Sequence, residues 1–166
     1  MKTNGSIYVA AVFAALAGYF VYQWWFNPNR IVKARLGDIA AALSIPPNEP
    51  EIDRIARLAR LRKLATDDLH VKIGTTGADL ASRDAVLAAN ASLTPPGGWN
   101  VDFVDVDVRV NADDTARAFV TADVTSRDSQ TGQQTLDSRD VTLSFVKQDG
   151  EWLVREAEVK DLPKPR

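Results

Sequence analysis

The spacing of apolar residues changes near Leu69, and this change limits the fold more than any other feature. Before Leu64 the apolar residues recur at helical spacing, whereas from Leu69 onward they alternate with polar ones, as in half-buried strands. One short alternating run covers 69–73, and four long ones come after it at about 100–110, 116–126, 136–146 and 152–161. A chain with helices first and most strands last is expected to form an α+β fold.

The first long run contains a break in its alternation. Val101 and Phe103 are apolar at odd positions, whereas the valines from Val104 to Val110 stand at even positions. One extra residue near Phe103 or Val104 would restore a common face, and such a β-bulge also bends the strand. Asp149-Gly150 between the last two runs predicts a tight hairpin turn. We therefore expect a curved antiparallel sheet.

Three helices are expected at about 30–43, 50–65 and 82–93. Pro28 would end or bend the preceding apolar helix, after which the first of the three restarts with Asn27 or Asn29 as its cap. Ser82 would cap the third. Asn48 followed by Glu51 is typical of a capping box for the second helix. The apolar face predicted for that helix consists of Ile52, Ile55, Leu58, Leu61 and Leu64, with arginines covering its other sides.

The N-terminal segment from Ile7 to Phe26 carries no charged residue. As a helix it would be about 30 Å long, which matches a bilayer core. Ala15-Leu16-Ala17 is compatible with a cleaved signal peptide, but the apolar run continues beyond it, which favours a retained anchor. The predicted organisation is a transmembrane anchor at 1–27 and a soluble domain at 28–166.

Three groups of residues around this segment are candidates for contacts. Aromatic side chains predict a membrane-interface belt at its end: Tyr19, Tyr22, Trp24, Trp25 and Phe26. Small residues at Ala10, Ala14 and Gly18 would allow close packing of a partner helix, although such a stripe also suits contact with lipid. Basic residues beyond the segment are candidates for headgroup or partner contacts, or are simply solvated: Arg30, Lys33, Arg35, Arg54 and Arg57.

The orientation of the segment is open from charge alone. Lys2 precedes it, while Arg30, Lys33 and Arg35 come after it, so the positive-inside rule favours a cytoplasmic domain. A short lysine-containing tail before an apolar run is also the usual form of a signal anchor that exports the domain behind it. The prediction is a single-pass protein of the inner (cytoplasmic) membrane with a periplasmic domain.

Composition argues against several functions. A formal charge of -2 provides no strongly basic surface for nucleic acid. The absence of cysteine and the single histidine argue against a transition-metal site, and Asp105 to Asp114 do not fit a calcium loop. We predict no catalytic residue, no metal and no cofactor.

The order of elements resembles the α+β cone shared by nuclear transport factor 2, ketosteroid isomerase and SnoaL-like proteins. The segments that carry the resemblance are "PEIDRIARLARLRKLATDDLHVKIG", "SRDAVLAANASL", "WNVDFVDVDVRV" and "DGEWLVREAEVKDL". For the isomerases it implies a carboxylate base and a tyrosine in the cone, but all three tyrosines lie in the N-terminal segment. For the dehydratases it implies a His and Asp pair, for which His70 is the one histidine present.

Two functions from different classes are our hypotheses at this point. The first is a non-catalytic, single-span accessory or scaffold subunit of a larger bacterial-type membrane complex, respiratory or photosynthetic for example. Its partners would be integral membrane subunits and the lipid bilayer, and a homodimer of cone domains is a further alternative. The second is a cone that binds a small ligand or acts as an isomerase or dehydratase, with His70 or an aspartate as base.

Overall fold

The computed structural model describes residues 4–25, 27–74 and 77–161. Its helices are α1 (Asn4–Trp25), α2 (Pro28–Leu43), α3 (Glu51–Lys63) and α4 (Arg83–Ala91). Its strands are β1 (Ala65–Ile73), β2 (Ala78–Leu80), β3 (Trp99–Val110), β4 (Thr115–Arg127), β5 (Gln134–Gln148) and β6 (Glu151–Asp161). The chain thus has the α+β organisation expected from the change in spacing.

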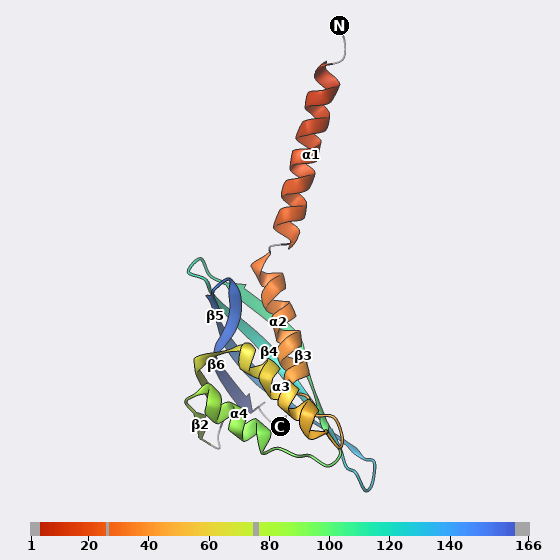
Figure 1. Ribbon diagram of the computed structural model, residues 1–166, viewed down its shortest axis with the longest axis vertical. Helices are drawn as coiled ribbons and strands as arrows, with labels where there is room; N and C mark the ends of the chain where they lie inside the picture. The colour runs from red at the N-terminus through yellow and green to blue at the C-terminus, as the bar shows by residue number, and fades with distance from the viewer. Residues whose placement is uncertain (1–3, 26, 75–76, 162–166) are drawn as a thin grey trace, which may run out of the picture.

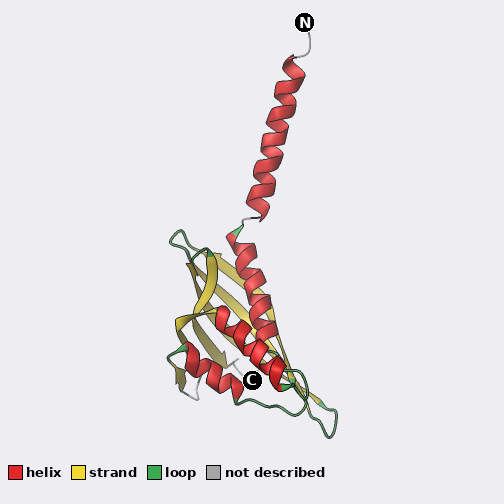
Figure 2. Ribbon diagram, viewed as in Figure 1, coloured by secondary structure: helices red, strands yellow, loops and turns green. Residues whose placement is uncertain are grey.

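The strands form one curved sheet with the order β2-β1-β6-β5-β4-β3. Helices α2, α3 and α4 lie on one face of it, and together they form the cone (Figure 1; Figure 2). The sheet is mixed and not purely antiparallel as predicted, because β1 and β6 are parallel. The chain runs through β2, α4 and three further strands before it returns beside β1, and so long a connection permits a parallel pair.

Strand β3 contains the bulge predicted from its sequence. Its pairing with β4 shifts between Val104 and Asp107, and Asp105 has a positive φ of 50°. After the shift, the partly buried valines 106, 108 and 110 join Val101 and Phe103 on the face that packs against the core. The bulge therefore gives the strand one apolar face despite the broken alternation.

Helix α2 packs across β3. The side chain of Asn27 caps it by accepting a hydrogen bond from the backbone N–H of Asn29 at 3.0 Å, and Pro28 occupies its first turn. Its inner face is among the most buried parts of the molecule, with Val32 and Leu36 at 0% and 2% exposure. Helix α2 is therefore anchored firmly to the sheet.

Helix α3 differs from its predicted form in its N-cap and in its apolar face. Its N-cap is Pro50, which makes no side-chain capping bond, so the predicted capping box of Asn48 does not form. Ile52 and Ile55 are 76% and 60% exposed, whereas Leu61 is buried. Residues spaced by three drift about 60° around a helix at each step, so this series cannot remain on one face.

Helix α1 extends away from the cone (Figure 1). Crossing a bilayer core takes one helix of about 20 predominantly apolar residues. No helix within the described residues is both long and apolar enough to do so. This finding contradicts the prediction of a single-pass protein held in the inner membrane by its N-terminal segment.

Candidate functional site

The interior of the cone contains a cavity of about 450 Å³. Its wall is formed by α2, α3 and α4 on one side and by the inner face of strands β1, β3, β4, β5 and β6 on the other. Most of the lining side chains are aliphatic, including Leu43, Val101 and Val141. An apolar molecule could bury its surface there without displacing the protein's own contacts.

The cavity exists because the inner strand positions carry small residues. Ala65 on β1, Ala122 on β4 and Ala157 on β6 line it, and valines are the commonest residue at the other strand positions. Phe103 and Trp99 are the large side chains on its β3 side, and the indole N–H of Trp99 donates to the carbonyl of Leu43 at 2.8 Å. Trp99 is thus held against the wall, and the centre is left unfilled.

Three lining residues have polar side chains: Asn90 on α4, and Asp137 and Arg139 on β5. Asp137 and Arg139 form an ion pair at 3.1 Å and are respectively 58% and 38% exposed, which places them where the cavity meets solvent. Asn90 is only 7% exposed. The deep part of the cavity therefore presents one polar side chain to a ligand.

Asn90 is fixed by a buried cluster that was not expected from the sequence. Arg57 Nη1 donates to Asn90 Oδ1 at 2.5 Å and to the carbonyl of Ala42 at 3.3 Å. Both oxygens of Glu49 accept from the same guanidinium, at 2.7 Å from Nε and 3.1 Å from Nη2. The cluster joins α2, α3, α4 and the loop before α3. Arg57 is 5% exposed, which corrects the prediction that it covers an outer side of its helix and contacts headgroups or a partner.

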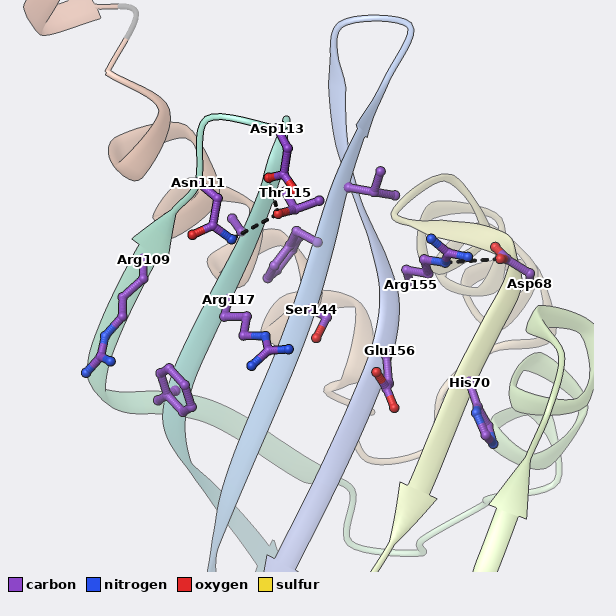
Figure 3. A pocket seen from close by; sticks show the side chains of 14 residues that line it. Asp68, His70, Arg109, Asn111, Asp113, Thr115, Arg117, Ser144, Arg155 and Glu156 are labelled. Carbon is purple, nitrogen blue, oxygen red and sulfur yellow. Dashed lines mark hydrogen bonds and ion pairs between the residues drawn. The ribbon is translucent and has the colours of Figure 1, made fainter.

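The opposite face of the sheet carries a second, polar groove of about 810 Å³ (Figure 3). His70 lies in this groove and pairs with Asp79 on the neighbouring strand β2. It points away from the cone cavity, because the alternating side chains Leu69 and Val71 line that cavity. His70 therefore cannot act as a base for a ligand inside the cone.

Several charged groups of the groove are held by local contacts. Asp68 accepts from Arg155 at 3.2 Å, and Arg109 lies over the ring of Phe119 with 5.2 Å to its centroid. The Thr66 hydroxyl, with a smaller contribution from Arg155, holds the pKa of Asp68 below its ordinary value. These are local interactions on an exposed surface, and they provide no isolated reactive group.

The remaining predicted site residues are spread over two regions. Tyr19 and Tyr22 are exposed on α1, which also carries Ala14 and Gly18. Ala10, Trp24 and Trp25 belong to the same helix, but their side chains and all of Phe26 lie outside the described residues. Arg30 and Lys33 are exposed on α2, while Arg35 is partly buried and pairs with Glu151 at 3.5 Å; Arg54 is partly buried on α3. The predicted contacts of these residues with a membrane or a partner stay predictions.

Comparison with known proteins identifies the fold. No family model and no curated protein matches the sequence. An NTF2-like protein with a cystatin-like fold from Novosphingobium aromaticivorans superposes with a TM-score of 0.70 at 15% identity, covering 90% of this chain and 92% of that one. The chain thus has the NTF2-like cone fold that the sequence resemblance implied.

Two further structures illustrate how varied the proteins with this fold are. A Novosphingobium aromaticivorans protein provisionally described as a scytalone dehydratase has a TM-score of 0.63 at 14% identity, covering 81% of this chain and 83% of that one. The association domain of C. elegans CaMKII has a TM-score of 0.58 at 10% identity, covering 78% and 89%. At such identities the likeness defines the fold, and function has to be argued from the site.

Proposed function

We propose that the cone binds a small apolar molecule without transforming it. The observation that carries the proposal is the apolar cavity of about 450 Å³, which lies within the range of about 300 to 1,000 Å³ typical of small-molecule sites. An apolar ligand is favoured because each square ångström of apolar surface that it buries contributes about 25 cal/mol. Entry would take place at the Asp137 and Arg139 end.

The lining supports binding more than catalysis. An isomerase or dehydratase needs an acid or base within hydrogen-bond reach of its substrate. Among the described lining residues, the one carboxylate is Asp137, which is exposed at the opening and engaged by Arg139. No histidine or tyrosine of the described residues lines the cavity, so proton transfer deep inside it has no evident agent.

The proposal is tested by titration with N-phenyl-1-naphthylamine, an uncharged fluorophore that brightens in apolar surroundings. We expect the full chain to bind it and Ala122→Leu, which adds three carbon atoms inside the cavity, to bind it about tenfold more weakly. Ala59→Leu makes the same change at an exposed position of α3 and is the matched control. Absence of binding to the unaltered chain, or equal binding by both variants, would refute the proposal.

A second candidate function is association through the outer face of the sheet with a second copy of the chain. Phe119 and Val104 are each 38% exposed on this face, which gives it apolar surface to bury. Arg117 and Asp140 lie on the same face, and no described residue forms an ion pair with either. A two-fold interface brings the same patch of both copies together, so a basic and an acidic residue on that patch can pair across the axis. One solved structure of this fold is itself named an association domain.

Sedimentation velocity tests this second candidate. We expect a dimer that Arg117→Glu weakens and that the double variant Arg117→Glu with Asp140→Arg restores, because the two charges are then exchanged. A monomer at all concentrations would rule out the association. A dimer that neither variant changes would place the interface elsewhere.

A further inference from the structure

The hydrogen-bonding state of Asn90 carries information about the ligand. Its carboxamide has one acceptor group, Oδ1, and one donor group, Nδ2. Oδ1 accepts from Arg57 at 2.5 Å, and because a guanidinium can only donate, this contact fixes which end of the amide faces Arg57. Nδ2 must therefore point away from Arg57.

Nδ2 has no hydrogen-bond partner among the residues that the structure describes. Among the described residues, one side-chain polar atom is both fully buried and without a partner, and it is Nε of Arg83. Nδ2 of Asn90 also lacks a partner, so it is not fully buried and a solvent-sized probe still reaches it. Asn90 as a whole is 7% exposed and lines the cone cavity. The cavity is thus the place where this donor is accessible.

An unpartnered donor in an apolar wall distinguishes between ligands. A pure hydrocarbon bound there would bury Nδ2 without a hydrogen bond, which costs free energy, whereas an acceptor oxygen on the ligand would satisfy it. A carboxylate is less suitable, because the described deep lining holds no unpaired cation that would compensate for its burial. The Glu49 and Arg57 contacts hold the amide in place, so the donor is oriented before a ligand arrives.

We propose that the ligand is an uncharged, largely apolar molecule with one acceptor oxygen, such as a ketone or ester carbonyl, which accepts a hydrogen bond from Asn90 Nδ2. This inference rests on the proposed binding function and adds the ligand class to it. It also assigns Asn90 as the residue that selects the ligand. The arginine and glutamate behind Asn90 are positioning residues.

A matched pair of probes separates this inference from simple apolar binding. 2-Acetylnaphthalene and 2-isopropenylnaphthalene have nearly the same shape, but only the first has a carbonyl oxygen. Their affinities are measured by displacement of N-phenyl-1-naphthylamine from the full chain. We expect the ketone to bind about fivefold more tightly, which corresponds to one hydrogen bond of about 1 kcal/mol.

The variant Asn90→Asp keeps an oxygen for Arg57 and replaces the donor by an acceptor, so the fold is retained while the polarity toward the ligand is inverted. We expect this variant to lose the preference for the ketone or to reverse it. Asn111→Asp, at an exposed position on the outer face, is the control and should keep the preference. Equal binding of both probes to the unaltered chain, or a preference that survives Asn90→Asp, would overturn the inference while apolar binding stands. Binding of neither probe would overturn both.

Discussion

Replacing Arg57 tests whether the buried cluster holds the cone together. Arg57 donates four hydrogen bonds, two to Glu49, one to Asn90 and one to the carbonyl of Ala42. The side chains of Arg57 and Glu49 are 6% and 7% exposed. In Arg57→Met the carboxylate of Glu49 would be left buried without its partner, and breaking a buried pair in this way costs about 3 to 5 kcal/mol.

The measurement is urea unfolding followed by tryptophan fluorescence, for which Trp152 is a suitable reporter because it is buried in the core. Arg57→Met should lower the free energy of unfolding by about 3 to 5 kcal/mol. The control Arg60→Met, at an exposed position of the same helix, should change it by less than about 0.5 kcal/mol.

The double variant Arg57→Met with Glu49→Leu removes both charges. It should regain part of the loss but stay about 1 to 3 kcal/mol below the unaltered chain, because Asn90 and the Ala42 carbonyl still lack their donor. A loss below about 1 kcal/mol for Arg57→Met, or a double variant less stable than the single one, would refute the reasoning.

Three further predictions concern the turn at Gly98, the bulge of β3 and the pH dependence of β1. Gly98 has φ 69°, and a Cβ there would lie 2.6 Å from the carbonyl oxygen of Ile45. Gly98→Ala should therefore lower the free energy of unfolding, measured by chemical denaturation, by about 2 kcal/mol or more. A smaller loss would show that this loop can move to make room for the methyl group. Asp105 has φ 50°, which glycine adopts without strain and a β-branched residue does not. Asp105→Gly should therefore keep the free energy of unfolding within about 0.5 kcal/mol of the unaltered chain, whereas Asp105→Val should lower it by about 1 to 2 kcal/mol. Equal losses in the two variants would contradict the bulge geometry. Because folding lowers the pKa of Asp68, its contribution to stability is complete above the ordinary value of 3.8 and is lost as the pH falls through the folded-state pKa. In an NMR titration Thr66→Val should move this pKa up toward 3.8, since the Thr66 hydroxyl is the main cause of the shift, and an unchanged pKa would exclude that cause.

Elements with regular local patterns could be predicted from the sequence. The β3 bulge was predicted from the broken alternation around Phe103, and the cap at Ser82 from its position before an apolar helix. In both cases the cause lies within a few neighbouring residues. The parallel pairing of β1 with β6 could not be found in this way, because it depends on residues more than eighty positions apart.

The residues of the candidate site were harder to predict for a related reason. Arg57 was expected to be exposed because its side chain is charged. It precedes Leu61 by four residues and Leu64 by seven, so the three share one helical face. This spacing was the feature of the sequence that could have indicated its burial. Asn90 stands among alanines, where an asparagine is an unfavourable helix residue without a tertiary partner. Its partner, Arg57, belongs to another helix, so only the fold brings the two together.

The apolar run in α1 was the basis for predicting a membrane span. The absence of charge between Ile7 and Phe26 favoured a membrane span, yet no described helix has both the length and the apolarity that crossing requires. The description of the cone does not depend on that segment, since α2 begins with its own cap at Asn27.

A crystal structure of the full chain with 2-acetylnaphthalene bound would test the central claim most directly. The account predicts the naphthyl ring inside the cone between Leu43 and Val101, with the carbonyl oxygen about 2.7 to 3.2 Å from Asn90 Nδ2. A probe bound only on the outer face of the sheet, or a cone interior that stays without ligand at saturating probe, would contradict it.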